Sequence, residues 1–372
     1  MRRAMLATLA LCAATFAGAQ GVTESQIVLG QSVALSGPAS ELGKDMQSGA
    51  KLYFDFVNKS GGVNGRMIIL KTLDDGYDPP RAVENTKKLI NEEKVFALFG
   101  YVGTPTSNAS LPIFTEAKVP FIGAFTGAES LRTPFNRNIF NVRASYFDET
   151  EAIVQHLTAM SVNNIAIFYQ NDAYGQAGLA GVERALKKRN LELSARGTVE
   201  RNTVDVAKAV EDIRKANPQA VIMISAYKSC AAYIKAMKLK GSNPTFWNVS
   251  FVGSKALAKE LDSDGRGVQI SQVVPFPWDP SIPVVKEYRA LLAEAKGEPG
   301  YGTLEGFIAA KVTVEGIKRA GKNLNRESFT KAMESMGALD VGGFKVSFTP
   351  ESHNASKFVD LTIISRDQKF VR

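Results

Sequence analysis

The chain has 372 residues, of which 45% are hydrophobic, and carries 45 Lys and Arg against 37 Asp and Glu, giving a formal net charge of +8. This length exceeds what one hydrophobic core comfortably serves, which favours two domains. The basic residues alternate with acidic ones along predicted helices such as 205–215 and 255–262. Without a single-sign patch or interleaved aromatic residues, we expect no nucleic-acid partner.

The N-terminal residues have the pattern of a secretion signal. Two arginines precede an apolar stretch over residues 4–16, and Ala17-Gly18-Ala19 then supplies a small-x-small cleavage site. We therefore predict a signal peptide over residues 1–19, a mature chain that begins at Gln20, and a periplasmic location. No later apolar run approaches the roughly 20 residues that a membrane span needs.

The chain contains two cysteines, Cys12 and Cys230. Cys12 could indicate a lipoprotein, but Leu11 occupies the position where a small residue is expected, so cleavage without lipidation is favoured. Loss of Cys12 with the signal peptide would leave Cys230 without an intramolecular disulfide partner.

Strand-like and helix-like segments alternate along the mature sequence. In the first half the predicted strands are 27–29, 67–73, 95–99, 120–122 and 139–142, and the predicted helices are 43–58, 80–93 and 107–117. In the second half the predicted strands are 165–169, 193–199, 220–225, 245–249 and 268–273, and the predicted helices are 148–160, 175–190, 203–216, 228–239 and 255–261. This repetition predicts an α/β fold with two doubly wound, Rossmann-like lobes.

The boundary between the lobes is indicated by a predicted capping box, in which Asp148 is followed three residues later by Glu151. The tail differs from both halves, with predicted helices over 284–295, 304–320 and 326–336 and short strands near 344–348 and 358–364. A tail of this length suggests that the chain returns to the first lobe. We predict an N-terminal lobe of residues 20–142 plus 274–350 and a C-terminal lobe of residues 143–273 plus 351–372.

Two glycine-containing loops, residues 100–107 and 123–127, each follow an apolar strand. Parallel buried strands would bring both loops to the carboxyl edge of one sheet, which is where open α/β sheets bind ligands. The loops carry hydroxyls at Thr104, Thr106 and Thr126 but no charge, so hydroxyls, backbone N–H groups and helix N-termini are available for a small carboxylate. A simpler interpretation is that Thr104 only caps the helix that begins at Pro105.

Aromatic residues follow several predicted strands and would converge on a cleft that holds an organic ligand. These residues are Tyr101, Phe125, Tyr146, Tyr174, Tyr227, Phe276 and Trp278. The alternative for each residue is ordinary packing in the core.

Signatures of catalysis and cofactor binding are missing from the sequence. His156 and His353 are the two histidines, and neither has metal-ligand spacing to other residues. There is no Walker A loop, no Gly-x-Gly-x-x-Gly loop after the first strand and no Gly-x-Ser-x-Gly elbow. The stretch 74–78 resembles part of a calcium loop but lacks the later acid, so a polar turn is favoured. We predict a non-enzymatic protein without catalytic residues, cofactor or metal.

Five motifs resemble the type I periplasmic solute-binding proteins of ABC transporters, in the leucine/isoleucine/valine-binding branch. The motifs are residues 27–38, 61–66, 117–120, 171–175 and 250–253. The resemblance covers essentially the whole mature chain. It implies two lobes joined by three crossovers, with a ligand clamped between them by hinge closure.

The resemblance also implies roles for individual residues. Thr104 matches the hydroxyl that holds the ligand carboxylate, while Ala124 and Thr126 match the second loop of that grip. Leu42 falls where relatives place a side chain against the ligand. Tyr174 and Tyr227 match aromatic residues of the closing lobe.

Ser250 departs from this family pattern. Amino-acid-binding relatives have a glutamate here that pairs with the ligand ammonium, so the sequence leaves that ammonium without its expected partner. Asp172 could substitute for the missing glutamate, although capping the next helix is the simpler role for Asp172. Phe125 also differs from the family pattern, because it replaces a residue that is usually small. The sequence therefore favours a carboxylate ligand without an ammonium group.

These observations lead to a hypothesis about function. We expect an exported, monomeric receptor that captures a small organic carboxylate and delivers it to an inner-membrane ABC permease. The alternatives are a conventional branched-chain or aromatic amino-acid receptor, a sensory receptor for the same ligands, or an exported enzyme on the same fold.

Overall fold

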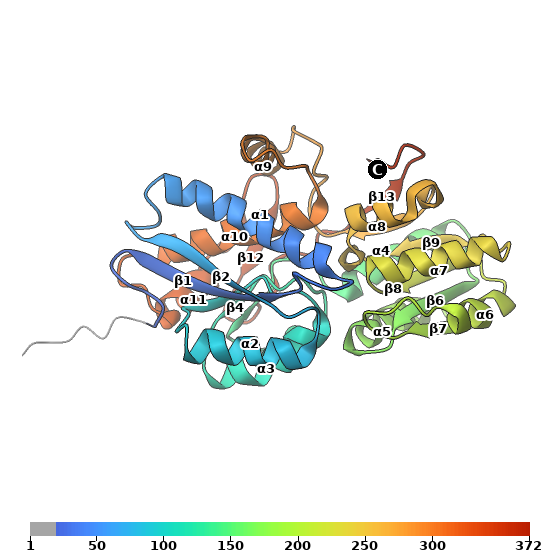
Figure 1. Cartoon of the computed structure of the whole chain (residues 1–372), viewed down its shortest axis with the longest axis horizontal. Coiled ribbons are helices and arrows are strands. Elements are labelled where there is room, and N and C mark those ends of the chain that lie inside the picture. Colours follow the sequence, from blue (N-terminus) through green and yellow to red (C-terminus); the bar gives the residue numbers. More distant parts are fainter. Residues whose placement is uncertain (1–19) are drawn as a thin grey trace, which may run out of the picture.

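The computed structural model describes residues 20–372 and shows two α/β lobes side by side (Figure 1). The predicted signal peptide lies outside the described residues. Within residues 20–372, no helix combines the length and the apolar character that crossing a membrane requires.

The N-terminal lobe is built on a five-stranded parallel sheet with the order β2-β1-β3-β4-β5. Its strands are β1 (Gln26–Val33), β2 (Met67–Asp74), β3 (Ala97–Phe99), β4 (Phe121–Ile122) and β5 (Ile139–Phe140). The helices between them are α1 (Ser40–Lys59), α2 (Pro79–Asn91) and α3 (Thr104–Glu116). A 3-10 turn, η1 (Glu129–Leu131), precedes β5.

The C-terminal lobe is built on a seven-stranded sheet with the order β14-β13-β10-β9-β8-β6-β7, in which β13 and β14 are antiparallel to their neighbours. Its strands are β6 (Ile165–Gln170), β7 (Arg196–Val199), β8 (Ala220–Ile224), β9 (Thr245–Asn248), β10 (Gln269–Gln272), β13 (Asp360–Ile364) and β14 (Phe370–Val371). Its helical segments are α4 (Tyr146–Ala159), α5 (Ala173–Lys187), α6 (Ala207–Lys215), α7 (Tyr227–Leu239), η2 (Ser250–Val252), α8 (Ser254–Leu261) and η3 (Asp262–Gly265).

The tail returns to the N-terminal lobe, as its helical pattern suggested. It contributes α9 (Pro283–Glu294), α10 (Tyr301–Ala320), α11 (Arg326–Glu334) and a hairpin of β11 (Gly337–Asp340) and β12 (Lys345–Phe348). Helix α10 packs along α1, as the adjacent blue and orange ribbons of Figure 1 show. The sequence reasoning missed β11 and β14, which are short strands at the edges of their sheets.

Three segments carry the chain between the lobes: residues 141–145, 273–282 and 349–359. The predicted lobe boundaries, after residues 142, 273 and 350, fall within these segments. The first and third segments run side by side, since the Asn141 amide donates to the His353 carbonyl (2.9 Å) and the Ala355 amide donates to the Asn141 carbonyl (2.8 Å). The resulting two-lobe architecture with three crossovers is the one that the sequence predicted.

The start of α4 corrects one detail of the sequence analysis. The capping box consists of Ser145 and Asp148, because the Asp148 amide donates to the Ser145 hydroxyl (3.1 Å) and the Ser145 amide donates to the Asp148 carboxylate (3.0 Å). Glu151 instead pairs with Lys188 and Arg189, which lie just past the C-terminal end of α5. This earlier start places Tyr146 and Glu149 in the first turn of α4, where both side chains are buried at the junction of the lobes.

Candidate functional site

The two predicted ligand loops lie side by side at the carboxyl ends of β3 and β4. Val102 and Phe125 form a parallel bridge, and the Phe125 amide donates to the Tyr101 carbonyl (2.7 Å). The first loop requires glycine at position 103. Gly103 has a φ of +100°, and a Cβ there would come within 2.3 Å of the Tyr77 ring.

Three hydroxyls meet at these loops, and we call Thr104, Thr126 and Tyr146 the hydroxyl cluster. The side-chain oxygens of Thr104 and Thr126 lie 2.7 Å apart, and the Thr126 hydroxyl lies 3.3 Å from that of Tyr146. Thr104 is the first residue of α3 and makes no capping bond, because Gly103 holds the N-cap position. The hydroxyl of Thr104 therefore faces the second loop, as the carboxylate-clamp interpretation expects.

A small cavity lies between the lobes, and its wall includes Phe125, the residue directly before Thr126. Its volume is about 10 Å³, which is no more than one water molecule needs. Its walls include three residues that the sequence analysis named, Leu42, Phe125 and Ser250. The structure is thus a closed form, and a larger ligand requires the lobes to separate.

Aromatic rings from both lobes pack together behind Phe125, which stands in the cavity wall. Phe251 lies 5.5 Å from Phe125, 5.9 Å from Tyr77 and 4.6 Å from Tyr174, measured between ring centroids. Tyr174 also packs 5.4 Å from Tyr146. The sequence analysis named neither Phe251 nor Tyr77 as a ligand contact, since it used Phe251 only as part of the 250–253 motif and interpreted the stretch that holds Tyr77 as a polar turn.

The other predicted residues have individual contacts in or near the junction of the lobes. Tyr227 and Leu42 both approach Gly253 at the cavity wall. Ala124 is buried in the N-terminal lobe, and its carbonyl accepts a hydrogen bond from the Thr126 amide (2.9 Å). Asp172 caps α5 through the Tyr174 amide (2.9 Å), so it has the simpler of its two proposed roles.

Two of the predicted residues outside the cavity lining, Tyr101 and Phe276, also have side chains apart from the hydroxyl cluster and its neighbouring rings. Tyr101 lies in a separate core cluster beneath α2 and α3, with its hydroxyl 3.0 Å from that of Thr86 and its ring 5.1 Å from Phe121. Phe276 lies in a neighbouring groove beside Trp278. Both residues follow strands, but the end of a strand fixes only the edge of the sheet and not the direction of the side chain.

A buried ionic cluster stands where the family pattern places its glutamate. We define it as Arg143, Glu149 and Glu305, contributed by the first crossover, α4 and α10 respectively. The Arg143 guanidinium lies 2.8 Å from Glu149 and 3.3 Å from Glu305, and it also donates to the Ser250 hydroxyl. Glu149 further accepts hydrogen bonds from the Ser250 amide (2.8 Å) and the Ser271 hydroxyl (2.6 Å).

The electrostatics of this ionic cluster raise the pKa of Arg143 and the pKa of Glu305. Burial alone would lower the pKa of Arg143, but the carboxylates of Glu305 and Glu149 outweigh burial and raise it, so Arg143 stays charged. Burial raises the pKa of Glu305 to about 7, although Arg143 acts in the opposite direction. A second acid that lines the cavity, Asp45 on α1, has its pKa raised to about 6 by burial, with Lys255 opposing that shift.

Sequence reasoning missed Arg143, Glu149, Glu305 and Asp45. Each residue is unremarkable in its own segment. Arg143, Glu149 and Glu305 meet only because the first crossover, α4 and α10 converge at the junction of the lobes, and Asp45 on α1 lines the same cavity as Glu305. Among the described residues, no group of three or more His, Cys, Asp or Glu side chains is arranged to hold a metal ion.

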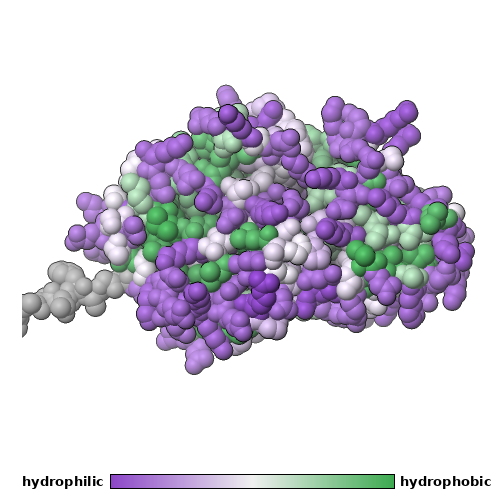
Figure 2. Space-filling view, viewed as in Figure 1, coloured by the Kyte–Doolittle hydropathy of each residue, from purple (hydrophilic) through white to green (hydrophobic). Residues whose placement is uncertain are grey.

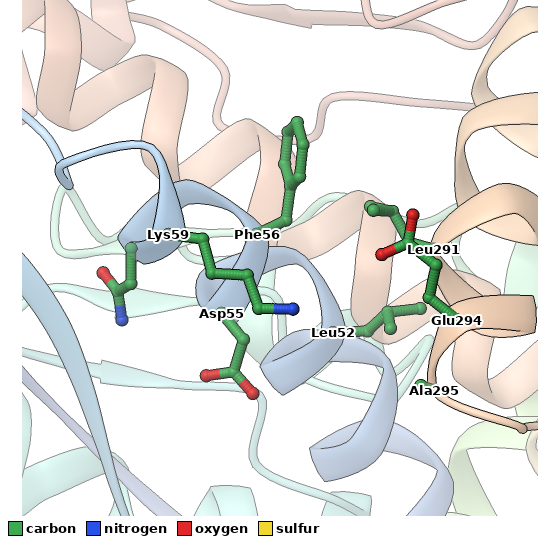
Figure 3. A pocket seen from close by; sticks show the side chains of 8 residues that line it. Leu52, Asp55, Phe56, Lys59, Leu291, Glu294 and Ala295 are labelled. Carbon is green, nitrogen blue, oxygen red and sulfur yellow. The ribbon is translucent and has the colours of Figure 1, made fainter.

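A larger depression lies elsewhere, on the outer surface of the N-terminal lobe between α1 and α9. Its volume is about 400 Å³, and Figure 3 shows Leu52, Phe56 and Lys59 of α1 opposite Leu291 and Glu294 of α9. None of the predicted ligand residues lines it. Most of the surface seen in Figure 2 is polar, with smaller apolar areas between the charged side chains.

Two α/β lobes that close on a small cavity, lined by Phe125, Asp45 and Glu305 on one side and by Ser250 on the other, have the architecture of a solute-binding protein. Comparison with known proteins gives the same class: residues 26–368 match the family described as periplasmic binding protein. The chain belongs to this family of non-enzymatic solute receptors, which includes the binding proteins of ABC transporters.

Individual relatives are similar over nearly the whole chain. The Leu/Ile/Val-binding protein homolog 7 of Brucella abortus is 23% identical, and the match covers 94% of this chain and 92% of that protein. A possible leucine/isoleucine/valine-binding protein from Rhodopirellula baltica has a solved structure with a TM-score of 0.90 and 34% identity, covering 94% of this chain and 97% of that one. A fatty acid ABC transporter substrate-binding protein from Thermomonospora curvata shares the fold, with a TM-score of 0.86 and 23% identity, covering 95% and 92% of the two chains.

Proposed function

We propose that this protein is the substrate-binding component of an ABC importer and that its ligand is an amino acid with an apolar or aromatic side chain. The protein captures the amino acid between its lobes in the periplasm and presents it to an inner-membrane permease. The observation that carries the proposal is that two carboxylates, Asp45 and Glu305, line an interlobe cavity whose wall also holds Phe125, the residue directly before Thr126 of the hydroxyl cluster.

The hydroxyl cluster suits the ligand carboxylate. Thr104 stands at the N-terminus of α3, a helix of 13 residues, where the helix dipole and free amides favour an anion. The three hydroxyls can donate hydrogen bonds to a carboxylate without placing a second negative charge beside it. The aromatic rings of Tyr174 and Phe251 suit an apolar side chain.

The carboxylates on the other side change the expectation drawn from Ser250. That expectation assumed that no acid would meet a ligand ammonium. Asp45 and Glu305 both line the cavity with Ser250, so the physical objection to an ammonium-bearing ligand no longer holds. The names of the Brucella and Rhodopirellula proteins support an amino acid, whereas the Thermomonospora protein keeps a carboxylate without an ammonium as the competing ligand class.

Calorimetry on matched ligand pairs tests this proposal. L-leucine is compared with 4-methylpentanoate, L-valine with 3-methylbutanoate, and L-phenylalanine with 3-phenylpropanoate, using protein stripped of co-purifying ligand by unfolding and refolding. We expect at least one amino acid to bind ten times or more tighter than its deaminated partner. Preference for the deaminated member in every pair would overturn the amino-acid assignment and support a plain carboxylate.

A further inference from the structure

The buried charges of the ionic cluster do not balance. One guanidinium, Arg143, faces two carboxylates, Glu149 and Glu305, and the side chains of all three are at most 7% exposed. A third carboxylate, Asp45, borders the same cavity. Lys255 acts to lower the pKa of Asp45, but its ammonium is paired with Glu298 at the surface. An excess of buried carboxylates is costly unless a cation or a proton compensates it.

The two acids that contact Arg143 differ in how well they are satisfied. Glu149 accepts hydrogen bonds from Arg143, from the amide and hydroxyl of Ser250 and from Ser271, so its role is to hold the crossover and the C-terminal lobe together. Glu305 accepts one hydrogen bond among the described residues, the longer one from Arg143 at 3.3 Å. Glu305 therefore has acceptor capacity left, and it lines the cavity, whereas Glu149 does not.

Asp45 and Glu305 lie on adjacent helices at the same cavity wall. A Cβ added to Gly302, one turn before Glu305 on α10, would lie 2.9 Å from an Asp45 carboxylate oxygen, which places that carboxylate over the first turn of α10. The Asp45 carboxylate has no side-chain hydrogen bond or ion pair in the part of the chain that the structure describes. Both acids belong to elements of the N-terminal lobe, opposite Ser250.

We propose that Glu305, assisted by Asp45, receives the ammonium group of the ligand, so that this receptor recognises the ammonium from the N-terminal lobe and not from the position of Ser250. The proposal rests on the proposed function, since it requires an amino-acid ligand. It makes Glu305 a specificity-determining residue: its carboxylate separates amino acids from carboxylates of the same skeleton.

A consequence is that binding an amino acid releases a proton. The charged groups that face Glu305 are Arg143 from the crossover, Glu149 from α4 and Asp45 from α1. In the closed form burial raises the pKa of Glu305 to about 7, so Glu305 is mostly protonated at pH 6 and mostly ionised at pH 8. An ammonium pairs only with the ionised form, so affinity should fall about tenfold between pH 8 and pH 6. A deaminated ligand brings no positive charge and should lose no affinity over this range.

Calorimetry on wild-type protein and Glu305→Gln tests the assignment. Glu305→Gln should bind L-leucine at least tenfold more weakly and 4-methylpentanoate no more weakly than the wild type does. Glu315→Gln is the matched control, since Glu315 lies on the same helix, pairs with Arg319 at the surface and lies outside the cavity lining. A merely structural role for Glu305 would weaken both ligands together and leave their ratio unchanged.

Two further measurements keep the test decisive if Glu305→Gln does not fold. Asp45→Asn should reduce the ratio of L-leucine to 4-methylpentanoate affinity in the same direction. Proton release by the wild type is measured from L-leucine binding enthalpies at pH 6 in buffers of different ionisation enthalpy, and we expect close to one proton per ligand. Two results would overturn this inference while sparing the proposed function. The first is wild-type protein that prefers L-leucine without releasing a proton. The second is a Glu305→Gln variant that still prefers L-leucine to 4-methylpentanoate. Wild-type protein that prefers the deaminated ligands would overturn both.

Discussion

The side-chain oxygens of Thr104 and Thr126 lie 2.7 Å apart, across the two loops that follow β3 and β4. Thr126 continues this contact to the hydroxyl of Tyr146, 3.3 Å away on the first helix after the crossover. The hydroxyl cluster therefore links the N-terminal lobe to the element on which the C-terminal lobe begins. A carboxylate that inserts here would accept hydrogen bonds from groups that now bond to one another.

Removal of the Thr104 hydroxyl tests this arrangement. Thr104→Val keeps the shape of the side chain but deprives a bound carboxylate of one charged hydrogen bond, at a cost of about 1.5 to 3 kcal/mol. Affinity for the preferred ligand should fall roughly ten- to a hundredfold. Thr313→Val is the control, because the Thr313 hydroxyl is buried in α10 and bonds to the Ala309 carbonyl (2.8 Å), away from the cavity. Equal affinities in the two variants would remove Thr104 from the ligand site.

Closure of the lobes should be visible in solution. Contacts between the lobes, such as Tyr77 with Gln170 (3.2 Å) and Asn202 with the Gly76 carbonyl (3.2 Å), exist in this closed form. A cavity of about 10 Å³ cannot admit an amino acid, so the stripped protein must open before it binds. Small-angle X-ray scattering should give a larger radius of gyration for stripped protein than for protein saturated with its preferred ligand. Identical values would show that the two lobes do not move.

The two lobes and the hydroxyl loops could be predicted from the sequence because local residue patterns encode them. Apolar runs such as 165–170 and 220–224 encode buried parallel strands by composition alone, so the two lobes could be predicted. The hydroxyl loops could be predicted too, because parallel strands deliver their following loops to one edge.

Charges at the junction of the lobes could not be predicted in the same way. Glu305 lies 162 positions from Arg143 in sequence, and no local pattern marks either residue as a partner of the other. In the sequence, Asp45 has the pattern of an ordinary surface acid on an amphipathic helix. The expected ligand without an ammonium group was inferred from one position, Ser250, where the family pattern differs. Asp45 and Glu305 were not part of that inference, because nothing in the sequence places them near Ser250.

Loss of the central guanidinium should destabilise the fold strongly. Arg143→Met removes the cation that compensates Glu149, a carboxylate that is 0% exposed, and breaking a buried ion pair in this way costs about 3 to 5 kcal/mol. Arg137→Met is a useful contrast, because Arg137 is half-exposed and its partner Glu327 is exposed as well. Exposed ion pairs of this kind contribute about 0 to 1 kcal/mol each. Urea denaturation compares the two variants, and similar losses of unfolding free energy would contradict the central role of Arg143.

Export should leave a mature chain that begins at Gln20. The expected mass of the periplasmic protein is that of residues 20–372 without lipid, measured on intact protein by mass spectrometry. In the structure the Gln20 side chain donates to the Ile90 carbonyl (2.9 Å), so the new N-terminus would lie against α2. A diacylated Cys12 at the N-terminus would instead identify a lipoprotein.

Tyr174 offers a test in which stability and binding change in opposite directions. Its hydroxyl is buried, lies at the cleft beside Tyr146 and Phe251, and has no hydrogen-bond partner among the described residues. A buried hydroxyl without a partner costs about 1 to 3 kcal/mol, so Tyr174→Phe should raise the unfolding free energy of the stripped protein. If the ligand supplies the missing partner, the same substitution should weaken binding by roughly tenfold, because about 1.4 kcal/mol corresponds to a factor of ten.

Tyr233→Phe is the matched control for this prediction. The Tyr233 hydroxyl is also buried without a partner in the described part of the chain, but its ring stacks 4.2 Å from Phe168 inside the C-terminal lobe. This variant should gain stability without losing affinity. Thermal unfolding and calorimetry on both variants separate the two roles. Removing a hydroxyl that bonds to the ligand lowers affinity, whereas removing a hydroxyl that only lies in the core does not. Unchanged affinity in a stabilised Tyr174→Phe would show that Tyr174 contributes only its ring to the cleft.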